Sequence, residues 1–235
     1  MWDNHAMLRN IADALFSVNV LLVLYGAIHY VAHQPDLLPV QIMRMEAIPQ
    51  RVSSDEILQA ARDGMRGNLV TVDIDRVRQS MEKLPWVRSV SVRREFPGRL
   101  AVKLEEHQVL ARWNSSMLVN LQGEVFAAQT KQELPEFVGP EGTSSEVTAY
   151  YAKFTQQLSV VDLQMTQVNL SARHAWQLRL VNGVTLELGR EDVQQRLDRF
   201  VKVYPYTIAS EQDKLKYVDL RYRNGFAVGG QVKQG

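Results

Sequence analysis

The residues that come closest to a catalytic motif are Ser80-Met81-Glu82-Lys83, which match the S-x-x-K string of penicillin-interacting serine enzymes. In those enzymes the serine is a nucleophile, and S-D-N and K-T-G motifs complete the site. Neither partner motif occurs in this sequence. The neighbouring residues repeat at helical spacing, with an apolar face that leaves Ser80 and Lys83 on the solvated side. We therefore interpret the string as part of a surface helix.

Two other groups of titratable residues could act as an acid and a base, or as metal ligands. Glu105, Glu106 and His107 are consecutive, so in a strand their side chains alternate between opposite faces and do not converge. His29 and His33 lie four residues apart and could share a metal, but the other three histidines are widely scattered. The sequence has no cysteine and no glycine-rich loop that would cradle a phosphate. It predicts no catalytic residue, no metal site and no cofactor.

The balance of charges argues against a further class of function. The 235 residues include 27 Lys and Arg and 26 Asp and Glu, so the net charge is close to zero. A nucleic-acid-binding protein usually carries a basic stripe. We expect neither a nucleic acid nor a small-molecule substrate, which leaves binding to other proteins as the main chemistry.

An apolar segment near the N-terminus predicts a membrane anchor. No Asp, Glu, Lys or Arg interrupts residues 14–35, and roughly 20 apolar residues suffice to cross the hydrocarbon core. A cleaved signal peptide is one alternative, but its apolar core is about 7–15 residues long and ends in a small-x-small site, where this sequence has Tyr30-Val31-Ala32. A buried helix of a soluble protein is the other. Aromatic and His residues clustered at one end of the segment favour a membrane interface.

The anchor sets the expected topology. We expect residues 1–13 in the cytoplasm, a transmembrane helix over 14–34, and the bulk of the chain in the periplasm, as in a single-pass type II protein of the inner membrane. Positive charges on the two sides of the segment support this orientation only weakly, and long domains translocate largely regardless of charge. Asn19, well inside the segment, either bonds a neighbouring helix or is tolerated alone.

Residues 38–106 predict a small α+β domain. The pattern indicates a strand, two helices and two strands, over residues 40–45, 53–65, 73–84, 86–96 and 99–106. Ser53 or Ser54 caps the first helix, with Glu56 placed to complete a capping box with Ser53. Asp73 caps the second helix, and Pro85 ends it. We expect both helices on one face of the sheet.

Residues 107–230 predict a second unit that is rich in hairpins, before a short tail over 231–235. Strand pairs turn at Gln122-Gly123 and at Asn182-Gly183, the strongest local hairpin signal in the chain. Amphipathic helices are expected over 144–158 and 190–204, the second ended by Pro205. The expected fold is an antiparallel-rich sheet with two flanking helices, and the whole chain belongs to the α+β class.

The last predicted hairpin poses a question. Val218, Leu220 and Tyr222 alternate with polar residues, Asn224-Gly225 supplies a turn, and Phe226 and Val228 resume the alternation in the sequence KYVDLRYRNGFAVGG. An apolar strand at the edge of a sheet invites pairing with another chain, and proteins usually protect such edges. We expect that another chain pairs here.

The chain resembles the FtsQ/DivIB family of bacterial cell-division proteins. The stretch LPWVRSVSVRREFPGRLAVKLEEHQVLARW is similar to the end of that family's POTRA domain, and LVNLQGEVF, LPEFVG, LELGRED and YVDLRYRNGFAVG are similar to its β domain, in the same order. In the β domain the match includes Arg196-Leu197 and Arg199-Phe200. The resemblance covers about residues 14–230 and implies a transmembrane helix, a POTRA domain over 38–106 and a β domain over 107–230.

The resemblance also implies partners. It implies a non-enzymatic divisome scaffold that binds FtsB and FtsL in the periplasm, helps control septal peptidoglycan synthesis by FtsW and FtsI, and contacts FtsK through the POTRA domain. In the family the last strand accepts a strand from FtsB, which is β-augmentation. The family's contact positions map to Tyr222, as the aromatic anchor, and to Asn224 and Gly225 in the turn.

Three further residues complete the expected binding site. Some relatives carry a Trp after the AVG of the terminal motif, where this chain has Gly230, so Phe226 is a candidate replacement. Arg190 and Arg196, at the start of the last helix, are candidates for acidic residues of the partner, or are ordinary surface arginines. The alternative functions are a POTRA-type chaperone or secretion component for envelope proteins, and an anchored envelope enzyme.

Overall fold

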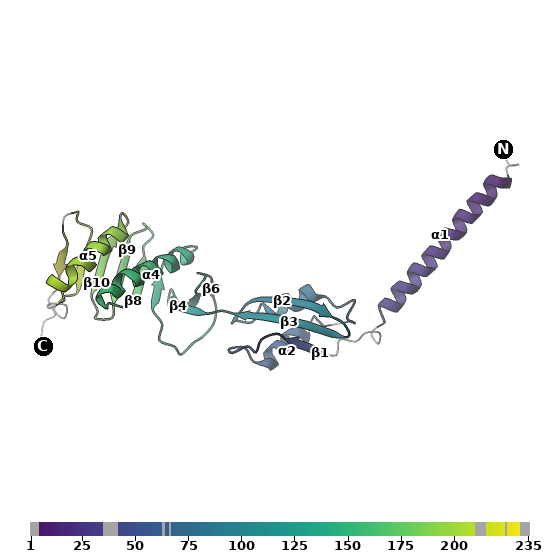
Figure 1. Ribbon diagram of the computed structural model, residues 1–235, viewed down its shortest axis with the longest axis horizontal. Coiled ribbons are helices and arrows are strands. Elements are labelled where there is room, and N and C mark those ends of the chain that lie inside the picture. The colour runs from purple at the N-terminus through teal and green to yellow at the C-terminus, as the bar shows by residue number, and fades with distance from the viewer. Residues whose placement is uncertain are drawn as a thin grey trace. The chain divides into compact units, whose positions relative to one another are not determined.

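The computed structural model describes residues 5–34, 42–62, 64–65, 67–209, 215–223 and 225–230. The chain divides into two compact units, Met1–Glu106 and His107–Gly235. Figure 1 shows a long helix and a small three-stranded domain in the first unit, and a larger sheet with two helices in the second.

The N-terminal helix α1 spans His5–Ala32. It is long and apolar enough to cross a membrane, and its side chains are exposed. Its polar side chains bond the preceding turn: the Asn19 amide donates to the Leu15 carbonyl at 2.8 Å, and the Ser17 hydroxyl to the Asp13 carbonyl at 2.8 Å. These bonds lower the cost of placing both polar groups in lipid, where water cannot satisfy them.

The small domain has the expected β-α-α-β-β order. Its elements are β1 (Ile42–Met45), α2 (Ser54–Arg62), α3 (Ile74–Met81), β2 (Val87–Glu95) and β3 (Arg99–Glu106). Strand β3 lies in the centre of the sheet, parallel to β1 and antiparallel to β2. The alternate residues Leu100, Val102 and Leu104 are buried in the core, as the strand period requires.

Both helices of this domain begin where the caps predict. The Glu56 amide donates to the Ser53 hydroxyl at 3.2 Å and the Ser53 amide donates to the Glu56 carboxylate at 2.8 Å, which is a capping box. The Asp73 carboxylate accepts from the Arg76 amide at 3.0 Å. The ends of both helices were predicted wrongly. Helix α2 ends at Arg62 and not at 65, and α3 ends at Met81 and not at 84, because the residues that follow α3 turn to bring the chain into β2.

The second unit contains a nine-stranded mixed sheet. Its strands, in the order of the sheet, are β12 (Ala227–Gly229), β11 (Tyr217–Asp219), β10 (Thr185–Gly189), β9 (Trp176–Leu180), β8 (Met165–Leu170), β7 (Glu136–Val138), β4 (Val109–Trp113), β5 (Met117–Asn120) and β6 (Val125–Phe126). Five of the eight strand pairs are antiparallel, and the β10–β11, β7–β8 and β4–β7 pairs are parallel. The predicted hairpins at Gln122-Gly123 and Asn182-Gly183 are both confirmed.

Helices α4 (Ser144–Leu158) and α5 (Val193–Thr207) pack on the apolar face of this sheet, with the short 3-10 helix η1 (Ser159–Val161) between α4 and β8. Phe154 and Phe200 from the two helices share one buried core with Leu178 and Leu186 of the sheet. The opposite face carries polar residues, as alternation along each strand requires.

Two local predictions for this unit are wrong. Pro205 does not end α5, which continues to Thr207, because a proline in the last turn removes only one helical hydrogen bond and the Ile208 amide still bonds the Tyr204 carbonyl at 3.1 Å. The last two strands do pair antiparallel, but their connection is the seven-residue segment 220–226 and not a tight Asn224-Gly225 turn.

Candidate partner-binding site

The titratable groups singled out from the sequence do not form a catalytic site. Glu105 pairs with Arg88 at 2.7 Å, whereas the Glu106 carboxylate accepts hydrogen bonds from three backbone amides, those of residues 50, 51 and 52, at 2.8–3.0 Å. His107 lies in the second unit, where its Nδ1 is 2.9 Å from the Asn120 amide. Ser80 and Lys83 lie at the end of α3 with no nucleophile–base contact between them among the hydrogen bonds of the described residues.

Metal-ligating residues also fail to converge. The His29 and His33 rings stack on each other with centroids 4.0 Å apart, on the last turns of α1. Within the described residues no group of three His, Cys, Asp or Glu could hold a metal ion. The remaining candidate for a functional site is a binding surface on the large sheet and at its edge.

Strand β12 is the open edge of the nine-stranded sheet. Within the part of the chain that the structure describes, it pairs only with β11, in the register Tyr217↔Gly229, Val218↔Val228 and Asp219↔Ala227. The side chains of Ala227 and Val228 are exposed. The edge strand therefore carries no charged side chain. Proteins commonly place a charge on an edge strand to prevent strand addition, and that protection is missing here.

Tyr222, the predicted anchor, is an exposed residue of the loop that follows β11. Because β11 ends at Asp219, the alternation that buries Val218 and Leu220 stops before Tyr222, whose side chain is 58% exposed. Tyr222 is therefore not a core residue. Gly225 lies in open space, with no atom within 4 Å of the position that a side chain would take. Asn224 lies outside the described residues.

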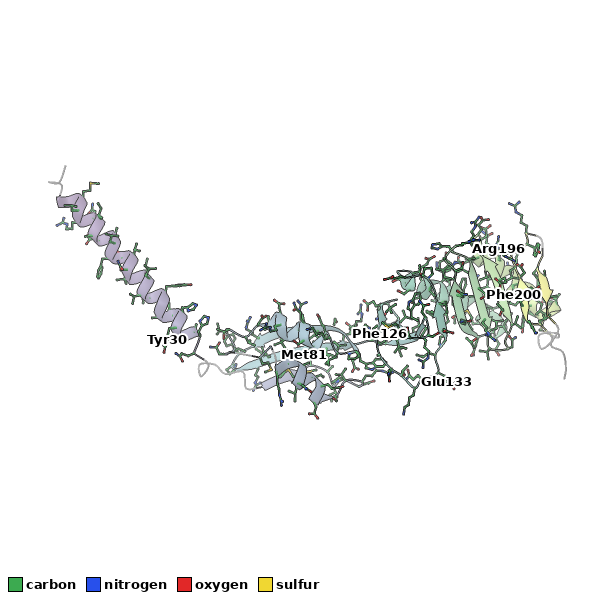
Figure 2. All side chains as sticks on the ribbon, turned by 180° about the vertical axis from the view of Figure 1, so that it is seen from behind. Tyr30, Met81, Phe126, Glu133, Arg196 and Phe200 are labelled. Atoms are coloured by element: carbon green, nitrogen blue, oxygen red, sulfur yellow. The ribbon has the colours of Figure 1, made fainter. Side chains whose placement is uncertain are left out.

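Arginine side chains from α5 hold this loop. The Arg199 guanidinium donates to the backbone carbonyls of Tyr222, at 3.1 Å, and of Arg223. Figure 2 shows Phe200, the next residue, against the sheet, with Arg196 one turn earlier on α5. The loop that carries Tyr222 is thus fixed to a helix that the core itself positions.

A groove lies between α5 and this loop. It encloses about 450 Å³, and the described residues that line it include no Asp or Glu. The floor is apolar and comes from Val203, Leu220 and Phe226, while the rim carries four cationic side chains, those of Arg196, Arg199, Lys202 and Arg223. Such a groove suits a peptide that combines apolar and acidic side chains.

The two arginines predicted for acidic partners differ in setting. The Arg196 side chain lines the groove and donates to the Leu188 carbonyl at 2.7 Å. That approach requires Gly189, since a Cβ there would lie 2.9 Å from the Arg196 Nη1. Arg190 is exposed, pairs with the neighbouring Glu191 at 3.5 Å, and lies outside the groove, beside a shallower hollow.

Asp219 supports the base of the loop. Its carboxylate is buried and accepts from the Arg221 guanidinium at 2.6 and 2.9 Å and from the Arg221 amide at 3.0 Å. The side-chain hydrogen bond from Arg221, which outweighs the desolvation of the carboxylate, holds the pKa of Asp219 below its ordinary value. The turn after β11 therefore contains a built-in ion pair.

Two aromatic residues, Phe226 and Tyr217, lie close to the edge strand. Phe226 is half-buried and packs against the core, so it forms the groove floor and is no exposed replacement for the missing aromatic. Gly230 has φ +86° and lies against the Lys216 side chain, which leaves no room for a Cβ. The exposed ring of Tyr217 instead covers Gly229, on the strand next to the edge.

Sequence reasoning missed Arg199, Lys202, Arg223, Val203 and Tyr217 as site residues. A signal existed on α5, because positions 196, 199 and 203 are three and four residues apart and so share one helix face. Helical spacing in the sequence could not predict which residues the loop contributes to the site, since these depend on where β11 ends.

Comparison with known proteins identifies the family. A model described as "POTRA domain, FtsQ-type" matches residues 38–107, and one described as "Cell division protein FtsQ/DivIB, C-terminal" matches residues 111–221. Cell division protein FtsQ of Nitrosospira multiformis is 40% identical over 98% of this chain and 99% of its own length. The chain belongs to the FtsQ/DivIB family.

Two further proteins named cell division protein FtsQ are similar over most of the chain. That of Burkholderia pseudomallei is 37% identical and covers 97% of this chain and 94% of its own length. That of Shewanella oneidensis is 38% identical over 86% of this chain and 78% of its own length. This FtsQ/DivIB family member is accordingly a structural divisome protein without catalytic activity, and the predicted fold class is confirmed.

Proposed function

We propose that this FtsQ/DivIB family member is a membrane-anchored scaffold that binds FtsB and FtsL by strand addition at β12. The anchor is α1, in a single-pass type II orientation in the inner membrane that places both folded units in the periplasm. The observation that carries the proposal is the open edge of the nine-stranded sheet, where β12 has no strand partner but β11 among the described residues.

The groove beside the edge supports one continuous partner segment. A strand added to β12 forms main-chain hydrogen bonds, which give affinity, and its side chains give specificity. Where that segment passes α5, apolar side chains meet Val203 and Leu220, and acidic ones meet Arg196, Arg199 and Arg223. Charge-assisted hydrogen bonds of this kind are the stronger ones, and arginine is well suited to carboxylates.

Tyr222 is the proposed anchor, next to the groove. Exposed tyrosines on a fixed loop are frequent among residues that dominate binding energy, because they offer a large contact area at low entropic cost. The Arg199 hydrogen bonds hold the Tyr222 backbone in place before the partner binds. Tyr217 supplies a second exposed ring where some relatives use a Trp after the edge strand.

The proposed role in cell division also involves the POTRA domain and the complex as a whole. We propose that the POTRA domain contributes to recruitment, including contact with FtsK, and that the complex with FtsB and FtsL links early to late division proteins. In this way it helps control septal peptidoglycan synthesis by FtsW and FtsI. No nucleic acid, cofactor or small-molecule substrate is involved.

A binding titration tests the proposal. The soluble part, residues 36–235, is titrated with the periplasmic segment of the cognate FtsB, as the unchanged chain and as Tyr222→Ala. We expect Tyr222→Ala to weaken binding by at least tenfold, about 1.4 kcal/mol. Phe96→Ala removes an equally exposed aromatic ring from the other unit and should leave the affinity unchanged.

Three results would count against this assignment. Equal binding by the unchanged chain and Tyr222→Ala would place the interface elsewhere. Loss of binding in Phe96→Ala as well would indicate a general response to losing an exposed aromatic. Binding by neither chain would remove the main mechanism and would favour a chaperone that holds many unfolded segments.

A further inference from the structure

The POTRA domain has one end at which three separate segments meet. Strand β1 begins there, with Ile42 opposite Arg99, beside the turn of residues 96–98 that joins β2 to β3. Arg94 brings in the α2–α3 loop, because its guanidinium donates to the carbonyls of Leu69 and Val72, each at 2.8 Å. We call this the entry end, since the chain enters the domain there from α1.

The entry end exposes apolar side chains that the core does not use. Phe96, in the β2–β3 turn, is 67% exposed, and Val70, in the α2–α3 loop, is 49% exposed. Both lie in loops, while the neighbouring Leu69 and Leu100 are fully buried. Apolar residues projecting from adjacent loops are the usual form of a shallow membrane contact, in which the rings enter the layer between headgroups and acyl chains.

The chain holds this end close to the membrane. Asp13 is the last charged residue of α1, and the 19 residues from Ala14 to Ala32 span about 28 Å, close to the thickness of the hydrocarbon core. An α1 that crosses the membrane therefore ends at its surface. Residues 35–41 connect Gln34 to β1 and can span at most roughly 29 Å.

A direct contact brings the POTRA domain closer to the end of α1 than the length of residues 35–41 alone would require. The side-chain amide of the buried Asn68 donates to the carbonyls of Ala32, at 2.7 Å, and of Gln34, at 2.9 Å. Asn68 belongs to the same loop as Val70, and its Oδ1 accepts from the Val70 amide at 2.9 Å. One amide thus joins the end of the membrane helix to the loop that exposes Val70.

The charge of the entry end fits an anionic surface. Arg44 pairs with Glu95 at 3.8 Å and Arg93 pairs with Glu46, so these four charges cancel. Arg94 is bonded to carbonyls and not to an acid, and the Arg99 side chain has no hydrogen-bonded or ionic partner in the described part of the chain. Among the described residues of the entry end the excess is therefore positive, and anionic headgroups attract such side chains close to a membrane.

We propose that the entry end of the POTRA domain rests on the membrane that holds α1, with Phe96 and Val70 in the interfacial layer and Arg99 against anionic phospholipid headgroups. This inference rests on the membrane anchor of the proposed function. It does not depend on the orientation of α1, because the POTRA domain follows the same end of that helix in either case. The contact would fix the direction in which the domain leaves the membrane.

The absence of cysteine makes the test specific. The full chain is reconstituted into vesicles of phosphatidylethanolamine and phosphatidylglycerol, with single cysteines labelled by an environment-sensitive fluorophore. The labelled variants are Phe96→Cys, Val70→Cys, Ile48→Cys and Tyr30→Cys. Lipids with a spin label on the upper acyl chain quench any fluorophore that reaches the interface.

Ile48 and Tyr30 are matched controls. Ile48 is 93% exposed but lies away from the entry end. It is between Glu46, whose amide bonds the Val102 carbonyl, and Gln50, whose amide bonds the Glu106 carboxylate at the far end of β3. Val102 and Glu106 are about 10 and 23 Å along β3 from Arg99. Tyr30 lies on α1 and reports whether the helix is inserted. We expect blue-shifted, quenched emission at positions 96, 70 and 30, and neither effect at position 48.

The labelled positions distinguish failure of this inference from failure of the proposed membrane anchor. Quenching at 30 without quenching at 96 and 70 would overturn this inference and leave the anchor standing. No quenching at 30 would overturn the anchor and, with it, this inference. Equal quenching at 48 and 96 would also overturn it, because the contact would not be confined to the entry end. A second readout avoids changing the labelled residue: with the label at 70, Phe96→Ser and Arg99→Glu should each reduce quenching.

Discussion

Asp219 has a buried carboxylate, and its ionised form stabilises the fold. Because Arg221 lowers the pKa of Asp219, the ion pair contributes stability above the carboxyl's ordinary value, near pH 4, and loses it as the pH falls through the lower folded-state value. Arg221 is largely exposed, so water screens the pair and we expect about 1 kcal/mol at neutral pH.

Asp219→Asn tests this at the residue scale. We expect the variant to be less stable at pH 7, with its free energy of unfolding falling less steeply than that of the unchanged chain below about pH 4. Urea unfolding at a series of pH values measures both effects. Parallel pH profiles for the two chains would show that Asp219 does not titrate differently in the folded state.

Glu106 and Glu105 are adjacent carboxylates with different roles. Glu106 caps three backbone amides that precede α2, whereas Glu105 forms a surface pair with Arg88. We expect Glu106→Gln to cost about 1–2 kcal/mol, because one charged acceptor serves three donors. The matched Glu105→Gln should cost well under 1 kcal/mol. Thermal unfolding of both variants decides the matter; equal losses would contradict the capping role.

At the scale of the element, the proposed strand addition depends on β12. Its uncharged surface can be altered without touching the core, because the Val228 side chain is exposed. We expect Val228→Lys to weaken binding of the FtsB segment by about tenfold, since a lysine on an edge strand opposes strand addition. Val160→Lys, at a valine of η1 that is also exposed, is the control for added charge.

Both measurements are titrations of the soluble chain, with circular dichroism to verify the fold. Unchanged affinity in Val228→Lys would exclude β12 as the paired strand, even if Tyr222 proves essential. Comparable weakening in both lysine variants would point to a general electrostatic effect instead.

At the scale of the whole molecule, the two units have separate cores. Each buried cluster contains residues of one unit only. All the proposed FtsB contacts lie in the second unit, so we expect a chain that begins at His107 to bind the FtsB segment within about twofold of residues 36–235. Calorimetric titration of the two chains measures this. A large loss in the shorter chain would show that the POTRA domain contributes to the site.

Local physical chemistry let the sequence alone determine most of the elements. The capping box at Ser53, the Asp73 cap and the Asn182-Gly183 hairpin each depend on residues within four positions of one another, so short-range patterns predicted them. The resemblance to the FtsQ/DivIB family added the order of the domains and the importance of the terminal strands. The resemblance also singled out Tyr222 as a candidate contact, which stays a prediction.

Only the tertiary structure decided how the terminal strands end and what lies beside them. The parallel pairing of β10 with β11 joins residues 32 apart, such as Thr185 and Tyr217, and no local pattern encodes such a register. The Asn224-Gly225 signal favoured a two-residue turn, which would pair Arg223 with Phe226, but the register pairs Asp219 with Ala227. The Arg199 guanidinium donates to the Tyr222 carbonyl, 23 residues away, beside the groove and the exposed Tyr222 ring. Such a contact joins distant elements through packing of the core, so no local pattern in the sequence predicts it.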